Sequence, residues 1–257
     1  VFLKNENYSE AFDILEQFDG RRLQSEEAET YREIMDYLYY EDYCSFDDVT
    51  TVSSDCVGSY TKNGWGLATA KGASIVAPKF KQIGFYANDV VTVCDTENVW
   101  YFMNREGEYQ YNISDSISGA ITEVGVYNHE LFPACVDEKY RYYTMDFTPC
   151  FGEYDYAGAF NAGVAAVKDG EAWRLINTDG SLVTEEAYQD VILDERGICC
   201  LNNRIFVKKD NTYIMLDSDG NRIGTEGFEN AKAFSSGEYA AVMDEGLWGY
   251  VDSLGDW

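Results

Sequence analysis

From residue 46 onward, apolar and polar residues follow one pattern that returns six times. A large apolar residue comes first, and a small or β-branched residue follows three positions later; the clearest copies then have an aromatic residue and a glycine at the next two steps of three. Those copies begin at Tyr154 and Phe228. The others begin at Phe46, Phe80, Ile121 and Tyr188, so the starts are 34, 41, 33, 34 and 40 residues apart. Such self-similarity predicts a repeat protein.

The second half of each unit predicts strands joined by tight turns. An alternating apolar stretch, such as 164–167 or 239–242, is typical of a β-strand. An aromatic residue follows it, and seven positions later stands a turn residue, which is glycine in five units and Pro149 in the third. The aromatic residues are Trp65, Trp100, Tyr142, Trp173, Tyr213 and Trp248. Glycine accepts the positive φ of a tight turn and proline does not, so the third turn is predicted to differ. The two longer spacings place insertions at 109–119 and 198–206, which we expect to be surface loops.

The units resemble the bacterial WG repeat family. Its motif has an aromatic-x-x-Ala-x-x-Phe-x-x-Gly lead-in, a Trp-Gly pair, a short strand and Asp-x-x-Gly. Trp65-Gly66 and Trp248-Gly249 match the pair, two further units keep only the tryptophan, and Tyr142 and Tyr213 replace it. The resemblance covers residues 46–257 and implies a repeat scaffold, with little chemistry.

These features predict an all-β repeat protein of six WG-type β-units, closed as a six-bladed β-propeller, with an open β-solenoid as the alternative. A short unit with an apolar stripe buries that stripe only by packing on its neighbours. The sixth unit ends at Trp257, before the strand that follows the turn glycine in other units. We expect residues 39–45, which lie just before Phe46, to complete this last unit and remove its exposed edge. The repeat domain then spans 41–257.

Residues 1–40 follow a helical period instead. Tyr8, Phe12 and Leu15 recur at helical spacing up to Asp19-Gly20, and a second period runs from Ala28 to Leu38. This predicts a helical hairpin, which weakly resembles the tetratricopeptide-like helix pairs placed before such repeats in bacterial surface proteins. We expect it to cover one end or face of the β-domain.

Charge and composition limit the classes of ligand that the chain can bind. The net charge is −27, so the chain has no basic patch with which to bind nucleic acid, and anionic membranes repel it. The single histidine, His129, and seven cysteines without a CxxC motif exclude a zinc site of the usual spacing. We expect no metal and no cofactor. Cys56, Cys94 and Cys135 fall in or just before predicted strands, where cysteine acts as a small apolar residue.

The sequence has no phosphate-binding loop and no nucleophile elbow. His129 stands in a loop before a strand, which favours an exposed residue over a catalytic one. Asp217 to Asn221 resembles the start of a calcium loop, but its spacing is wrong and turn chemistry explains it. With 46 acidic residues, paired carboxylates for glycoside cleavage stay open.

The function expected from this is a non-catalytic binding module for a protein or glycan ligand. Surplus tyrosines are the candidate contact residues, first Tyr109 and Tyr111, then Tyr101, because tyrosine offers large contact area at low entropic cost. The repeat aromatics themselves are expected to be core residues wedged between blades. The alternatives are a structural spacer or assembly subunit, and a carboxylate-based glycoside-active enzyme. We expect a monomer, anchored outside the cytoplasm by a segment before Val1, rather than a cytoplasmic protein.

Overall fold

The structure is a computed structural model, and it describes residues 46–235 and 237–257. The predicted helical hairpin at 1–40 and the segment 39–45 lie outside the described residues. The described chain is almost entirely β-structure, with one short helix, α3 (Ile113–Ser116). The all-β prediction is therefore confirmed.

The strands form six separate antiparallel sheets in the described part of the chain, here called blades 1 to 6. Blade 1 consists of β1 (Asp48–Val49), β2 (Cys56–Thr61), β3 (Gly64–Thr69) and β4 (Ser74–Phe80). Blade 2 consists of β5 (Gln82–Ile83), β6 (Val91–Cys94), β7 (Trp100–Met103) and β8 (Tyr109–Asn112). Blade 3 consists of β9 (Ile121–Val124), β10 (Leu131–Val136), β11 (Lys139–Thr144) and β12 (Pro149–Tyr154). Blade 4 consists of β13 (Tyr156–Ala157), β14 (Val164–Asp169) and β15 (Ala172–Asn177). Blade 5 consists of β16 (Asp190–Val191), β17 (Arg204–Lys209), β18 (Thr212–Asp217) and β19 (Arg222–Phe228). Blade 6 consists of β20 (Asn230–Ala231), β21 (Tyr239–Asp244) and β22 (Leu247–Asp252).

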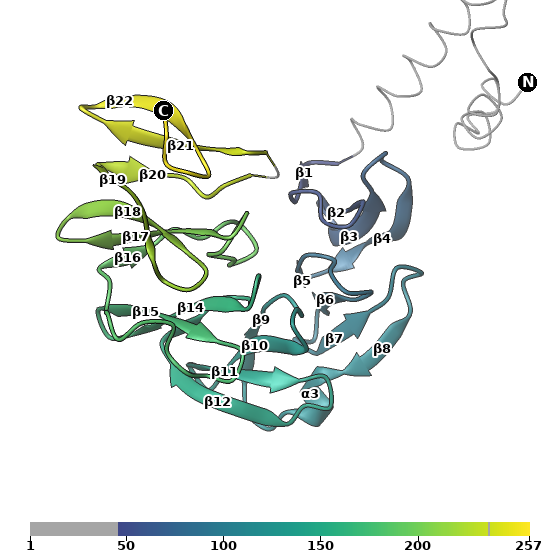
Figure 1. Cartoon of the computed structure of the whole chain (residues 1–257). Helices are drawn as coiled ribbons and strands as arrows, with labels where there is room; N and C mark the ends of the chain where they lie inside the picture. The colour runs from purple at the N-terminus through teal and green to yellow at the C-terminus, as the bar shows by residue number, and fades with distance from the viewer. Residues whose placement is uncertain (1–45, 236) are drawn as a thin grey trace, which may run out of the picture.

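The blades follow one another around a common centre, and the arrangement is propeller-like (Figure 1). Each predicted unit contributes one blade, because the first strand of every blade begins at or two residues after the start of a unit. A single residue separates the last strand of one blade from the first strand of the next at several junctions, as Lys81 does between β4 and β5. The backbone N–H of Lys81 already pairs with the carbonyl of Cys94 in blade 2.

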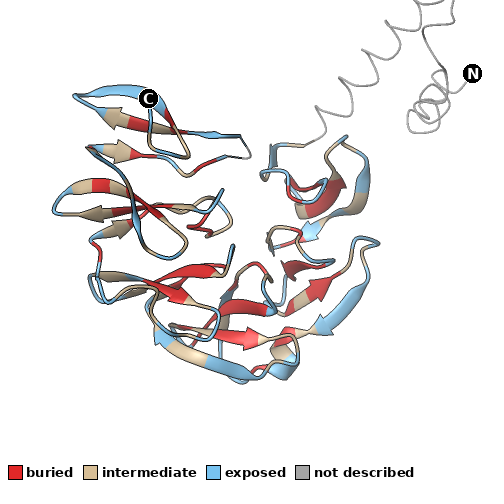
Figure 2. Cartoon of the chain, in the orientation of Figure 1, coloured by how far each residue is buried: buried red, intermediate tan, exposed pale blue. Residues whose placement is uncertain are grey.

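Alternation along the central strands explains how the blades pack. Strand β10 is buried along its whole length (Figure 2). Its residues Phe132 and Ala134 pack toward blade 2, whereas Leu131 and Cys135 pack toward blade 4. Successive side chains of a strand point to opposite faces, so one strand serves two interfaces. Five such apolar interfaces join blades 1 to 6 in order, and among the described residues no apolar cluster joins blade 6 to blade 1.

In blades 1 to 5, a two-residue turn directly precedes the second strand of the blade. Both central residues have positive φ, as in Asn88-Asp89 and Asn202-Asn203, which gives a twist that matches a hairpin. Polar side chains in or beside these turns donate to backbone carbonyls of the next blade. This inter-blade belt comprises Ser53 to Tyr86, Asn88 to Tyr127, Asn128 to Phe160, Asn161 to Cys200 and Asn202 to Gly237, at 2.6 to 3.0 Å.

The third unit requires a correction. Tyr142 and Pro149 do not occupy the aromatic and turn positions predicted for them. Tyr140 pairs with Tyr154 as Trp65 pairs with Phe80, and the turn residue is Phe147, with φ 63°. The N–H of Phe147 bonds to the carbonyl of Thr144, as the turn glycines do in the other units. The prediction failed because it relied on glycine to mark the turn, and here a phenylalanine adopts the glycine conformation.

Both predicted insertion loops also require correction. Residues 109–119 contain strand β8 and helix α3, whose Ile113 is buried together with Ile117 between blades 2 and 3. Apolar residues four positions apart lie on one side of a helical turn, so the segment packs inward. In the fifth unit, Cys199 and Cys200 are buried. The inserted residues there lie earlier, around Asp194, and the Asn202-Asn203 turn follows them.

The prediction that the repeat aromatics are core residues holds for Trp100, Tyr142 and Tyr213, which are buried between blades. It is wrong for Trp248 in the last blade, which is half exposed. Cys56, Cys94 and Cys135 are buried strand residues with free thiols. Within the described ranges, no helix is long and apolar enough to span a membrane.

Candidate functional site

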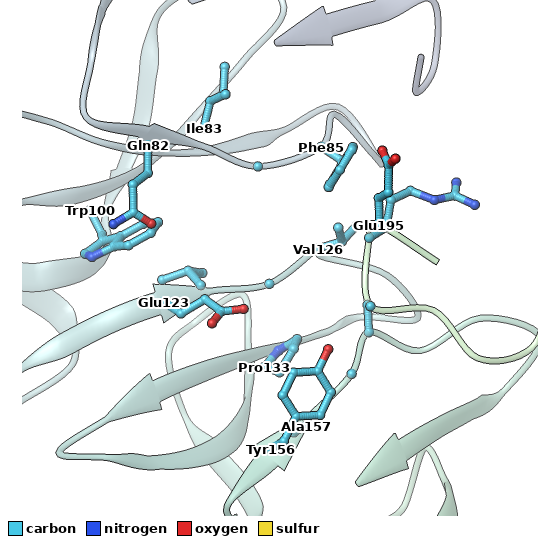
Figure 3. Close-up of a pocket in the computed structure, with 17 residues that line it drawn as sticks. Gln82, Ile83, Phe85, Trp100, Glu123, Val126, Pro133, Tyr156, Ala157 and Glu195 are labelled. Atoms are coloured by element: carbon cyan, nitrogen blue, oxygen red, sulfur yellow. The ribbon is translucent and has the colours of Figure 1, made fainter. Parts of the chain in front are cut away.

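A pocket of about 240 Å³ lies where the first strands of blades 2, 3 and 4 meet the inserted loop of blade 5 (Figure 3). Its polar lining comes from Gln82, Glu123, Tyr156, Glu195 and Arg196. Its apolar walls include Phe85, Trp100, Val126 and Pro133. We call it the axial pocket.

The repeat itself assembles this pocket. Gln82, Glu123 and Tyr156 each stand two positions after the start of their unit, so repetition brings three polar side chains to one wall. Glycine follows two positions later in each of these units, at Gly84, Gly125 and Gly158. A Cβ on Gly158 would lie 2.3 Å from the carbonyl oxygen of Gly197. Glycine thus lets the inserted loop approach the wall closely enough to form one side of the pocket.

Glu123 is held by a tyrosine from the neighbouring strand. The hydroxyl of Tyr140 donates to Glu123 Oε2 at 2.6 Å, and burial together with this bond raises the pKa of Tyr140. Burial, and then the charge of Glu123, raise the pKa of Tyr156 to about 12. Both phenols therefore stay protonated at neutral pH, and Tyr156 offers its hydroxyl beside a carboxylate.

The inserted loop closes the opposite side. Asp194 Oδ1 accepts from the backbone N–H groups of Arg196 and Ile198, each at 2.9 Å, which fixes a tight turn. The guanidinium of Arg196 pairs with Asp194 Oδ2 at 2.7 Å. The hydroxyl of Thr51 in blade 1 donates to Glu195, so the loop links the centre to the first blade. Two carboxylates, Glu123 and Glu195, thus line one pocket, together with hydroxyl and amide donors.

The sequence-predicted tyrosines lie elsewhere, on blade 2. Tyr109 and Tyr111 stand on β8, an edge strand, and are 48% and 46% exposed. The ring of Tyr109 stacks on that of Tyr101 with centroids 4.4 Å apart, and Lys79 Nζ lies 5.6 Å from its centroid. Tyr111 instead contacts Phe147, at 5.9 Å. The structure therefore brings Tyr101 and Tyr109 together, with Tyr111 on the same edge strand.

Sequence reasoning missed the axial pocket. The available signal was the polar residue at the third position of successive units. A polar residue at that position is ordinary for a strand, and the sequence does not show that the curvature of the chain brings three of these strands around one pocket. The inserted residues Glu195 and Arg196 carry no repeat signal at all.

The remaining candidate residues have structural roles. Asp217 Oδ1 accepts from the N–H groups of Asp219 and Asn221, as turn chemistry predicts. His129 is exposed in the turn before β10, and its Nε2 accepts from the N–H of Gly163 at 3.3 Å. No cluster of metal-ligating side chains occurs within residues 46–235 and 237–257.

Comparisons with known proteins agree with this architecture. A family profile described as "WG containing repeat" matches residues 152–173. Residues 152–173 are therefore similar to a WG repeat. The matched stretch covers the lead-in and Trp173 of the fourth unit, where the resemblance is clearest in the sequence. No curated protein matches the chain.

Among solved structures, the fold is similar to that of two yeast proteins. Hsv2p of Kluyveromyces lactis has a TM-score of 0.52 at 10% identity, over 80% of this chain and 73% of that one. Hsv2 of Kluyvelomyces marxianus has a TM-score of 0.51 at 8% identity, over 77% and 69%. At such identities the likeness concerns the fold alone.

Proposed function

We propose that this chain is a non-catalytic binding module, and that the aromatic edge of blade 2 contacts its protein or glycan ligand. The observation that carries this is the exposed Tyr109 on the edge strand β8, which stacks on Tyr101 of the neighbouring strand β7, with Lys79 beside it. A preformed aromatic surface costs little side-chain entropy on binding, and it suits both a sugar ring and a protein side chain. The propeller-like repeat scaffold supports an interaction role of this general kind.

The test is a glycan array together with partner capture, using the full chain and a Tyr109→Ala/Tyr111→Ala variant. We expect the double variant to lose at least tenfold in affinity for any ligand found, while its melting temperature changes little because both side chains are half exposed. Tyr60→Ala is the control, since Tyr60 is also exposed but belongs to blade 1. Equal binding by the double variant and the control would refute this surface as the site.

A second candidate rests on one observation, the presence of Glu123 and Glu195 in the axial pocket. Two carboxylates flanking a sugar bond can cleave it, one as general acid and one as base or nucleophile. Glu123→Gln and Glu195→Gln separate the two functions. An enzyme would lose turnover of a chromogenic glycoside by orders of magnitude in both variants. The proposed binding module shows no turnover in any form and keeps ligand binding in both.

A further inference from the structure

Blade 6 has one covered face and one uncovered face. Val242 on β21 and Val251 on β22 pack against blade 5 and are fully buried. The alternate residues point the other way. Tyr239, Trp248 and Tyr250 are 58%, 50% and 68% exposed. Tyr250 stands opposite Ala241 in the register of β21 and β22, and Trp248 opposite Met243, so these side chains share one face.

In every other blade this face is covered by the blade that follows. Trp248 and Tyr250 hold the repeat positions that Trp100 and Phe102 hold in blade 2. Trp100 and Phe102 are 3% and 0% exposed, and they pack against blade 3. The face of blade 6 therefore has the composition of an inter-blade interface without its second half.

Among the described residues, blade 6 also has no fourth strand. Blades 1, 2, 3 and 5 have a fourth strand beside the third, whereas blade 6 ends at β22. In blade 1, the backbone of β4 crosses directly over Gly66, where a Cβ would lie 2.4 Å from the carbonyl oxygen of Val76. Gly249 stands at the same position in blade 6, and a ring atom of Trp257 lies over it. Blade 6 thus retains the glycine that gives a fourth strand room in blade 1.

Blade 1 exposes the complementary half. Val49 and Val52 are 53% and 54% exposed, and a pocket of about 380 Å³ opens beside them. Their equivalents in blade 6, Ala231 and Phe234, are 2% and 3% exposed because they pack on blade 5. Blade 1 thus presents the surface that packs on a preceding blade elsewhere in the chain.

We propose that residues 40–46 form the fourth strand of blade 6 and bring these two surfaces together. Strand β4 spans residues 74–80, and its Phe80 both pairs with Trp65 and begins the second unit. Phe46 begins the first unit, so the equivalent strand is 40–46, with Phe46 opposite Trp248. This segment has no proline, and it is joined directly to blade 1.

The chain's own segment is the occupant favoured over a second copy of the chain. Linkage through Phe46 makes the pairing intramolecular, and short tethers give effective concentrations on the order of millimolar. A second copy at micromolar concentration competes poorly with such a tether for the same edge. The hydrogen bond from Thr51 to Glu195 already connects blade 1 to the inserted loop of blade 5.

A disulfide between the two ends tests the pairing in the full chain. Leu67 pairs with Val76 in blade 1, so the equivalent pair is Tyr250 and residue 42. Asp42→Cys is combined with Tyr250→Cys in a background in which Cys44 and the exposed Cys150 are serine. We expect mild oxidation to give an intramolecular disulfide, mapped by mass spectrometry. The control combines Asp42→Cys with Tyr109→Cys, at an exposed edge strand in blade 2, and should not cross-link.

Each other outcome overturns the proposal. Disulfide-linked dimers that increase with protein concentration would identify a second copy as the occupant. No cross-link, or equal cross-linking in the control, would show that residues 40–46 do not pair with β22. Hydrogen exchange of peptide 247–252 tests the same point without cysteines. Replacing residues 40–45 by glycine and serine in the full chain should speed its exchange at least tenfold, and unchanged exchange would refute the pairing.

Discussion

Leu175 and Leu247 offer a matched test of how the blades hold together. Leu175 on β15 is 0% exposed and lies in the interface between blades 4 and 5, where it packs near Val207. Leu247 begins β22 and is 74% exposed. The same substitution, leucine to alanine, therefore removes the same atoms from two opposite environments.

The expected loss in the free energy of unfolding follows from how far each leucine is buried. Shortening leucine to alanine removes the equivalent of three methylene groups, which at about 0.8 kcal/mol each gives roughly 2.4 kcal/mol of lost transfer free energy. The cavity adds to this, so Leu175→Ala should lower the free energy of unfolding by about 3 to 4 kcal/mol. Leu247→Ala should change it by less than about 0.5 kcal/mol.

Urea denaturation followed by tryptophan fluorescence measures both variants. A difference of less than about 1 kcal/mol between them would refute the assignment of Leu175 to a close-packed inter-blade interface. A second transition in Leu175→Ala would show that blades 1–4 and 5–6 unfold separately once the interface is weakened, because each blade packs mainly on its neighbours.

Three further results are expected. Asn161→Ala removes the donor that lies 2.7 Å from the carbonyl of Cys200, and it should cost about 2 kcal/mol in urea denaturation because that acceptor is left buried; no loss would exclude a stabilising role for the inter-blade belt. Burial raises the pKa of Tyr156 to about 12, so the unfolded chain loses this proton first and stability falls from pH ~10 to pH ~12. Tyr156→Phe should flatten that fall in melting temperature, and an unchanged slope would contradict it. Among the described cysteines Cys150 alone is exposed, so Cys150→Ser should remove the fast thiol reaction with a maleimide that remains in a Cys44→Ser background.

Much of the fold follows from the repeat pattern. The starts of the units, such as Phe80 and Tyr154, predict the first strand of each blade to within two residues. The pattern succeeds because each of units 2 to 5 packs between two neighbouring blades and needs the same apolar residues to do so. It fails where a residue adopts a conformation unusual for its type, as Phe147 does. Ile113 and Cys200, which the pattern assigns to surface loops, also escape it, because their burial depends on neighbouring blades.

The candidate site was less predictable. Composition points to Tyr109 and Tyr111, and their contact role stays a prediction; the structure shows that both are half exposed and that Tyr109 stacks on Tyr101. The axial pocket forms only because residues that are distant in sequence come together in the fold. Glu123 and Glu195 are far apart in sequence, and only the curvature of the chain places them around one space. Local patterns contain no information about that curvature.

The direct passage from β4 into β5 has a consequence for how such a chain changes in evolution. Because one continuous stretch ends one blade and begins the next, the borders of a unit in the gene need not match the borders of a blade. A duplication or deletion of about one unit, cut at any point, restores the same junction between neighbouring blades. The number of blades can therefore change in single genetic steps, and, with the pairing proposed for residues 40–46, the constraint on that number is that blade 6 must meet blade 1.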